Sequence, residues 1–120
     1  TCLEFDERAT IACKENAESN GIKNVTAMAG EVEKQHDLEQ NLQEHDVLIV
    51  DPPRSGLHPK VVEKITEYGP EHFIYISCNP KTQAADWAKL RSKYKTIDWT
   101  LADFYPQTPH IESIIIMKRK

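Results

Sequence analysis

Cys78 lies in a polar segment whose residue types suit nucleophilic chemistry. The hexapeptide SCNPKT around it follows an apolar run and precedes a helical pattern. Asn79 can cap that helix, and Pro80 suits its first position. The positive end of the helix dipole would then lie beside the thiol and favour the reactive thiolate. Most free cysteines are small buried hydrophobes, which is how we interpret Cys2 and Cys13, whereas Cys78, flanked by polar residues in a loop, is interpreted as a functional thiol.

Three carboxylates lie at or just after the ends of predicted strands, and chemistry in an open α/β sheet gathers beyond the carboxyl ends of its strands. Glu4 ends the first predicted strand and Asp51 the third, and Glu31 follows Gly30 directly after the second. A carboxylate at the position of Glu4 can hold a ribose hydroxyl pair, although acids at strand ends are common. Glu31 is equally consistent with a first-turn helix acid. Asp51 precedes two prolines, which form either a rigid rim of a site or a plain turn.

Glu112 is a candidate general base. It lies in the segment HIESI, where the chain enters its last apolar run. A carboxylate beside hydrophobic residues is suited to taking up a proton near neutrality. The alternative is a surface glutamate at the edge of a strand.

The elements that must position these residues alternate between strands and helices. Strands are predicted over residues 2–5, 25–29, 45–51, 73–77, 96–101 and 112–117. Helices are predicted over 6–20, 59–68 and 80–94, and a polar helix or helical turn over 31–43. Asp6 is expected to cap the first helix and Gly21 to stop it. Such alternation predicts parallel βαβ units, and the last two strands, with no helix between them, predict an antiparallel hairpin at one edge.

Composition is that of an ordinary single domain of 120 residues, with 39% hydrophobic and 28% charged residues. No apolar run approaches membrane-spanning length, and no signal-peptide pattern opens the chain. The three cysteines form no zinc-type cluster, so no metal is expected, and their sparse number indicates a reducing, cytoplasmic location.

Charge is distributed unevenly along the chain. Residues 1–50 hold 4 basic and 11 acidic residues, whereas residues 51–120 hold 11 basic and 8 acidic residues. Two differently solvated faces would explain this distribution. A second half that faces a polyanion would also explain it.

Three segments together resemble one family. The runs DPPRSGL, YISCNPKT and DFYPQTPHIESI are similar to the closing motifs of the RNA 5-methyluridine methyltransferases that act on tRNA and ribosomal RNA. The opening run CLEFDERATIACKENAESNGIKNVTAMAG is similar to an earlier strand–helix–strand stretch of that family. The resemblance covers essentially the whole chain, and SCNP with HIES at this spacing is specific.

The resemblance implies methyl transfer from S-adenosylmethionine to carbon 5 of a uridine in RNA. It makes Cys78 the nucleophile that bonds the base and Glu112 the general base, with Glu4, Glu31 and Asp51 lining the cofactor pocket. The family often has Asn or Asp where Glu31 stands. It usually has Arg-Asp late in the helix after the cysteine, whereas this chain has Ala85-Asp86.

The resemblance also implies a Rossmann-like methyltransferase sheet, mostly parallel with an antiparallel C-terminal edge. The family's glycine-rich cofactor turn follows a first strand that would lie before residue 1, and this chain has only four glycines. We therefore expect residues 1–120 to be the C-terminal part of a catalytic domain, a fragment that lacks the first strand. Such a fragment should bind the cofactor weakly or not at all and should be inactive alone. The resemblance implies no particular oligomeric state.

Two other functions compete with this interpretation. One is a methyltransferase for another target, either cytosine in RNA or an exocyclic amine. Amine methyltransferases have an aromatic residue after Asp/Asn-Pro-Pro, where this chain has Arg54, and the pair of Cys78 and Glu112 favours uracil. The other is a module that binds RNA or assists assembly without turnover.

Overall fold

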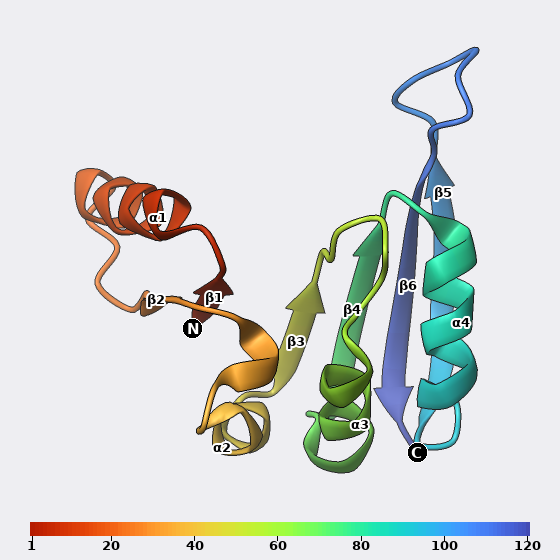
Figure 1. Cartoon of the computed structure of the whole chain (residues 1–120), viewed down its shortest axis with the longest axis horizontal. Helices are drawn as coiled ribbons and strands as arrows, with labels where there is room; N and C mark the ends of the chain where they lie inside the picture. Colours follow the sequence, from red (N-terminus) through yellow and green to blue (C-terminus); the bar gives the residue numbers. More distant parts are fainter. The chain divides into compact units, whose positions relative to one another are not determined.

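The computed structural model describes residues 1–120, along which strands and helices alternate (Figure 1). The chain divides into two units, Thr1–Leu38 and Glu39–Lys120. No helix in the structure is long and apolar enough to cross a membrane.

The first unit contains a strand–helix–strand arrangement. Its elements are β1 (Cys2–Glu4), α1 (Glu7–Ser19), β2 (Ala27–Ala29) and the 3-10 turn η1 (Val32–Lys34). β1 and β2 pair in parallel and end together, with Glu4 opposite Ala29. The acidic residues that follow these strands therefore lie at one end of the pair.

Both ends of α1 form as the sequence predicts. The side chain of Asp6 accepts a hydrogen bond from the backbone N–H of Arg8, which caps the first turn. At the other end Gly21 has a φ of 66°, and the amide of Ile22 reaches back to the carbonyl of Ala17 at 2.8 Å. This is the Schellman arrangement, in which a glycine adopts the left-handed conformation.

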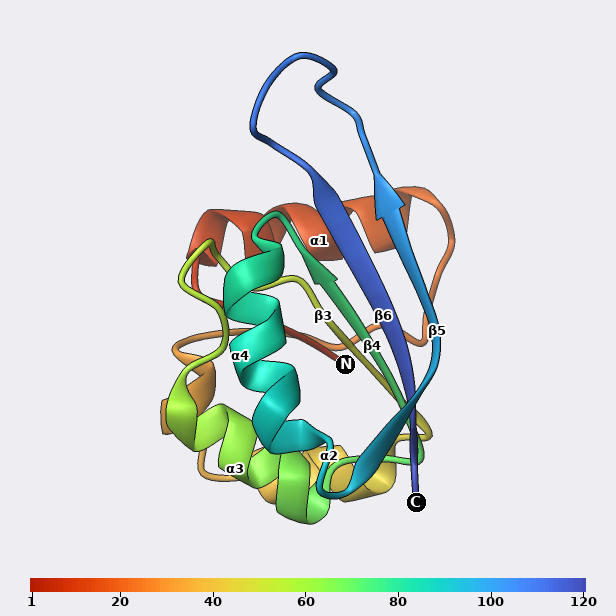
Figure 2. The same ribbon diagram turned by 90° about the vertical axis from the view of Figure 1, so that its right-hand side faces the viewer.

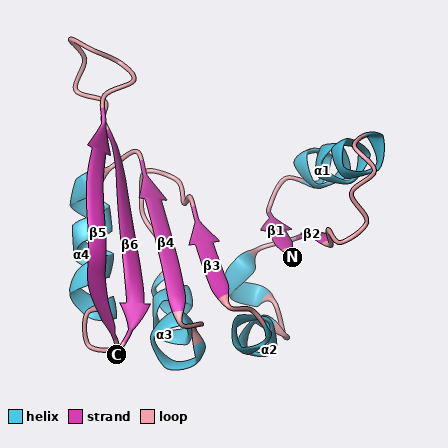
Figure 3. Ribbon diagram, turned by 180° about the vertical axis from the view of Figure 1, so that it is seen from behind, coloured by secondary structure: helices cyan, strands magenta, loops and turns pink.

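The second unit is built on a four-stranded sheet. Its elements, beginning at the boundary, are α2 (Leu38–Glu44), β3 (Val47–Val50), α3 (Pro59–Tyr68), β4 (His72–Ser77), α4 (Pro80–Leu90), β5 (Tyr94–Ala102) and β6 (Glu112–Arg119). The strand order is β3-β4-β6-β5, in which β3 and β4 are parallel and β6 is antiparallel to both of its neighbours. The last strand thus inserts between β4 and β5 (Figure 3).

The core lies on the helix-covered face of this sheet. Figure 2 shows α3 and α4 on the same side of the strands. Along β4 the side chains of Phe73, Tyr75 and Ser77 are buried and alternate with half-buried ones. The ring of Phe73 stacks on Tyr75 at 6.0 Å and meets Tyr94 edge-on at 5.7 Å.

The predicted α/β architecture, with parallel pairs and an antiparallel C-terminal hairpin, is present. The segment predicted as a polar helix or helical turn over residues 31–43 consists of the 3-10 turn η1 and the helix α2, separated by Gln35–Asp37. The helix predicted to reach residue 94 ends at Leu90, because Tyr94 already begins β5 and is buried in the core.

Candidate active site

Three connections of the second unit meet at one end of its sheet. The carboxyl ends of β3, β4 and β5 and the start of β6 all lie there (Figure 1). The β4–β6 register ends at the pair Ser77 and Ser113. Cys78 directly follows Ser77, and Glu112 directly precedes Ser113 at the start of β6. The topology therefore brings Cys78 and Glu112 to neighbouring positions. Both side chains are partly buried.

The segment around Cys78 has the predicted capped-helix geometry. The side chain of Asn79 accepts a hydrogen bond from the amide of Lys81 at 3.3 Å, and Pro80 occupies the first turn of α4. The amide of Asn79 in turn donates to the hydroxyl of Ser77 at 3.0 Å. Cys78 is thereby held between the end of β4 and the start of a helix.

The connection between β3 and α3, residues 51–58, is fastened to this segment through Arg54. Its carbonyl accepts hydrogen bonds from the side chains of Asn79 and Thr82, at 2.9 and 3.1 Å. Its guanidinium lies 3.2 Å from Nδ1 of His110, in the connection between β5 and β6. Because a guanidinium can only donate, Nδ1 is the acceptor in this contact. Arg54 thus joins the three connections at the rim.

Asp86 is a buried residue of this region whose role the sequence interpretation missed. Its Oδ2 atom accepts hydrogen bonds from the amide of Leu57 at 2.9 Å and the hydroxyl of Tyr75 at 2.7 Å. Burial, and then the bond to this carboxylate, raises the pKa of Tyr75. Gly56 has a φ of 83°, and a Cβ there would lie 2.8 Å from the same oxygen. The connection therefore approaches Asp86 as only glycine allows.

Helical spacing could have identified this residue. Gln83, Asp86 and Leu90 share one face of α4 at intervals of three and four, and all three are buried. Gln83 donates to the carbonyls of Tyr75 and Ser113, at 2.9 and 3.2 Å. Two polar residues on an otherwise core-facing stripe signal bonds to the sheet beneath.

The three residues predicted to hold a cofactor are divided between the units. In the first unit the Glu4 carboxylate is exposed and accepts the amide of Asp6 at 3.0 Å, and the Glu4 carbonyl accepts the amide of Gly30 at 2.9 Å. Glu31 forms an ion pair with Lys34 at 2.6 Å, and this hydrogen bond holds the pKa of Glu31 below its usual range. In the second unit Asp51 is exposed.

A carboxylate that forms no ion pair can accept hydrogen bonds from the hydroxyl or amino groups of a ligand. Glu4 and Asp51 form no ion pair, so their oxygens can accept hydrogen bonds from such a ligand. Glu31 would have to share its oxygens with Lys34. No group of three or more His, Cys, Asp or Glu side chains could hold a metal ion.

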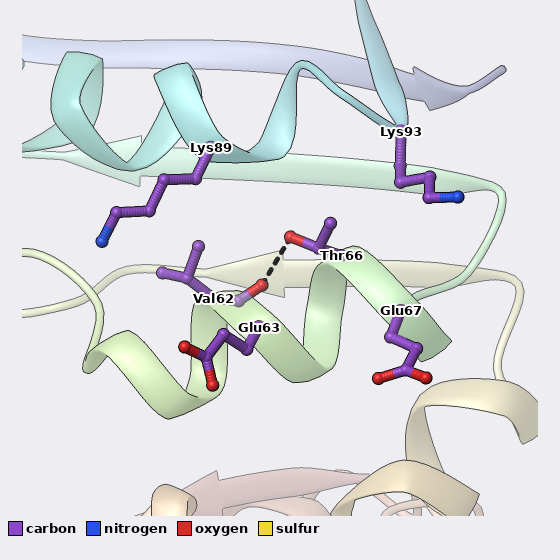
Figure 4. A pocket seen from close by; sticks show the side chains of 6 residues that line it. All are labelled: Val62, Glu63, Thr66, Glu67, Lys89 and Lys93. Carbon is purple, nitrogen blue, oxygen red and sulfur yellow. Dashed lines mark hydrogen bonds between the residues drawn. The ribbon is translucent and has the colours of Figure 1, made fainter.

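A hollow of about 560 Å³ lies away from the rim, between α3 and the C-terminal part of α4 (Figure 4). It is lined by Val62, Glu63, Thr66, Glu67, Lys89 and Lys93. None of these is a predicted site residue. The predicted site residues of the second unit, Cys78, Glu112 and Asp51, thus lie at the rim and not in this hollow.

Comparison with known proteins identifies similar sequences. A model of the family described as tRNA (Uracil-5-)-methyltransferase matches residues 10–120. A tRNA (uracil(54)-C(5))-methyltransferase from Pyrococcus furiosus is 38% identical over 117 residues, which cover 96% of this chain and 27% of that protein. An uncharacterized RNA methyltransferase from Caldanaerobacter subterraneus is 37% identical over 118 residues, covering 98% of this chain and 26% of that protein. The chain spans about a quarter of the length of these relatives.

Solved structures are similar as well. The tRNA (uracil-54, C5)-methyltransferase of Pyrococcus abyssi, in complex with S-adenosyl-L-homocysteine, matches with a TM-score of 0.80 at 32% identity, over 96% of this chain and 27% of that one. An rRNA methylase from Streptococcus thermophilus matches with a TM-score of 0.69 at 12% identity, over 98% and 70% of the two chains. The second match concerns the fold alone.

Proposed function

Because the chain belongs to the tRNA (uracil-5-)-methyltransferase family, we propose that it carries the residues that methylate carbon 5 of a uridine in tRNA or rRNA. Its fold is the Rossmann-like fold of S-adenosylmethionine-dependent methyltransferases, and S-adenosylmethionine is the proposed donor. The observation that supports the proposal is the β4–β6 register, which has Cys78 and Glu112 as the next residues beyond its last pair.

Cys78 acts as the nucleophile in this proposal. Carbon 5 of uracil is a poor nucleophile, but a thiolate that bonds carbon 6 pushes electron density onto carbon 5. The cofactor, when bound, supplies an electrophilic sulfonium methyl group to that carbon. The thiolate therefore activates the base by bonding to it directly and does not need to contact the cofactor.

Glu112 acts as the base that completes the reaction. After methylation, carbon 5 carries both a methyl group and a hydrogen. The Glu112 carboxylate takes that proton, the electron pair re-forms the bond between carbons 5 and 6, and the carbon–sulfur bond breaks. The thiolate of Cys78 leaves and is ready for another cycle.

Glu4, Glu31 and Asp51 would hold the cofactor. Glu4 suits a ribose hydroxyl pair, as carboxylates at strand ends do in nucleotide-binding sheets. Asp51 follows β3 at the same end of the sheet as Cys78. Its exposed carboxylate can accept hydrogen bonds from amino groups. Glu31 contributes to the extent that its pair with Lys34 leaves an oxygen accessible.

The test is covalent trapping on RNA that contains 5-fluorouridine. A base cannot remove the fluorine that replaces the hydrogen at carbon 5, so elimination is blocked and the methylated adduct should remain attached to Cys78. We would assay the chain alone and a chimera in which it replaces the matching segment of the Pyrococcus abyssi enzyme, with S-adenosylmethionine present. Mass spectrometry should find the adduct on the peptide that contains Cys78.

Cys78→Ser should abolish the adduct, and Cys13→Ser, which changes a half-buried thiol on α1, should preserve it. Adduct formation by the Cys78→Ser chimera would refute the assignment. A chimera that binds the RNA but never forms an adduct would favour the non-catalytic RNA-binding or assembly module.

A further inference from the structure

The connection between β5 and β6, residues 103–111, extends beyond the end of the sheet (Figures 1 and 2). We call it the projecting loop. Its two aromatic residues, Phe104 and Tyr105, are 69% and 56% exposed. Adjacent aromatic side chains on a loop lose the water-excluding contacts that usually stabilise them, so a function in binding is their natural explanation.

The projecting loop has its own internal hydrogen bonds. The amide and the hydroxyl of Thr108 both donate to the carbonyl of Tyr105, at 3.1 and 2.7 Å. The amide of Tyr105 donates to the carboxylate of Asp103 at 3.2 Å, and the amide of His110 donates to the hydroxyl of Thr108. The aromatic pair is therefore presented by a folded turn.

The loop is also joined to the rim that carries Cys78. The ring of Tyr105 meets that of His110 edge-on at 6.3 Å, and His110 accepts the hydrogen bond from Arg54. The carbonyl of Arg54 is held by Asn79, the residue next to Cys78. A series of contacts thus connects the ring of Tyr105, through His110 and Arg54, to the residue next to Cys78.

Cations without acidic partners lie on the same rim. Arg54 and Lys81 form no ion pair, and Lys81 is exposed in the first turn of α4. Exposed aromatic rings beside unpaired cations are what single-stranded nucleic acid requires, because bases stack on the rings and phosphates approach the cations. In a double helix the bases stay stacked on one another, so none of them is available to stack on the aromatic rings.

We propose that the projecting loop and Arg54 form a docking surface for single-stranded RNA, in which Phe104 and Tyr105 stack on bases that flank the base reacting with Cys78. The proposal rests on the proposed function for the identity of the reacting base. The binding surface itself follows from the exposed rings and unpaired cations. A reacting base must leave any stack to reach an enzyme, and flanking bases held on aromatic rings would stabilise that open state.

The experiment measures binding of fluorescent single-stranded oligouridine to the 120-residue chain by anisotropy at fixed salt. Phe104→Ala and Tyr105→Ala should each weaken binding about tenfold, the effect of one lost stacking partner. Both side chains are exposed, so melting temperatures should not change. Ile97→Ala, which removes a 53% exposed side chain from β5, is the matched control and should bind normally.

A double-stranded RNA of similar length should bind the unaltered chain more weakly, and the aromatic substitutions should not affect it. Unchanged oligouridine binding in both aromatic variants would overturn the proposal, as would the absence of any binding by the unaltered chain, which would leave a protein partner for the loop. If Cys78 forms adducts while the aromatic variants bind normally, the inference fails and the proposed function stands. If the aromatic variants bind oligouridine weakly but Cys78 forms no adduct, the inference stands and the proposed function fails.

Discussion

The carboxylate of Asp86 connects α4, the helix that begins after Cys78, to the connection that follows β3. One oxygen accepts both the Leu57 amide and the Tyr75 hydroxyl, although the residue is only 7% exposed. A buried carboxylate is costly unless its hydrogen bonds are satisfied. Here both bonds come from groups that would themselves be unpaired without it. Asp86 therefore acts on the site by positioning the Arg54 segment.

Replacing Asp86 should lower the free energy of unfolding. Asp86→Ala leaves a buried hydroxyl and a partly buried amide without an acceptor, and each such group costs about 1–3 kcal/mol of the free energy of unfolding. Asp86→Asn keeps an acceptor of the same shape and should recover much of the loss. Urea denaturation measures both. Adding Tyr75→Phe to Asp86→Ala should cost less than the sum of the two single changes, and strict additivity would show that the two side chains do not interact.

Glu112→Gln separates a catalytic role from a structural one. The amide keeps the shape of the side chain but cannot take the proton from carbon 5. In the chimera, addition of Cys78 and methyl transfer should proceed, but elimination should stall. A denaturing gel with ordinary uridine RNA and labelled cofactor should then show methylated RNA that remains attached to the protein. Release of free methylated RNA at the unaltered rate would contradict the assignment of Glu112 as base.

Local signals at the site could be predicted, and distant partners could not. The cap at Asn79 and the proline that follows depend on neighbouring residues, so the sequence predicts them correctly. Asp86 finds its partners 29 and 11 residues away, at Leu57 and Tyr75. Nothing in the local pattern specifies which strand faces that side of α4. The joining role of Arg54 escaped prediction for the same reason.

At the scale of elements, Arg119 stabilises the C-terminal end of α3. From β6 its guanidinium donates to the carbonyls of Thr66, Glu67 and Gly69 at 2.8–3.1 Å. These carbonyls lack partners within the helix. A cation at the C-terminal end also interacts favourably with the negative end of the helix dipole. The same group lies 3.3 Å from the Tyr94 hydroxyl, whose pKa is raised by burial and lowered by this cation.

Arg119→Ala should lower the free energy of unfolding by about 1–3 kcal/mol, because several hydrogen bonds from a charged donor are lost. The pKa of Tyr94 should rise further, since the neighbouring cation that lowers it is gone. Arg119→Lys keeps the charge but cannot bridge three carbonyls with a planar fork, so it should recover only part of the stability. Urea denaturation and ultraviolet titration of tyrosine measure the two effects. Lys95→Ala, an exposed cation on β5, is the control and should change neither.

The sequence predicts the existence of most elements more reliably than their arrangement. Strand β3 is a continuous apolar run, β4 has an apolar run between His72 and Ser77, and α1 has clear signals at both ends, so these appear close to their predicted ranges. The insertion of β6 between β4 and β5 is different. A hairpin pattern predicts that β5 and β6 pair, but which of the two meets β4 is decided by side-chain packing along the whole ladder.

At the scale of the whole molecule, the two edges of the four-stranded sheet differ. β5 is at one edge, and it carries Lys95, Asp98 and a bulge between Thr96 and Asp98, which are features that discourage further pairing. β3 is at the other edge and consists of four aliphatic residues, of which Val47 and Ile49 are 47% and 61% exposed. Such a continuous apolar strand is typical of the interior of a sheet. Its free backbone groups and exposed side chains can accept another strand.

We therefore expect the 120-residue chain to self-associate through β3 in solution. Sedimentation velocity at rising protein concentration should show larger species, because an unprotected apolar edge strand pairs with another copy. Ile49→Lys places a charge on that strand and should shift the distribution toward the monomer while leaving the melting temperature of dilute protein nearly unchanged. Ile97→Lys makes the same exchange on the protected edge, at β5, and should have little effect. Equal responses to the two lysines would mean that association depends on general surface hydrophobicity, and a chain that stays monomeric would mean that the β3 edge is covered by other means.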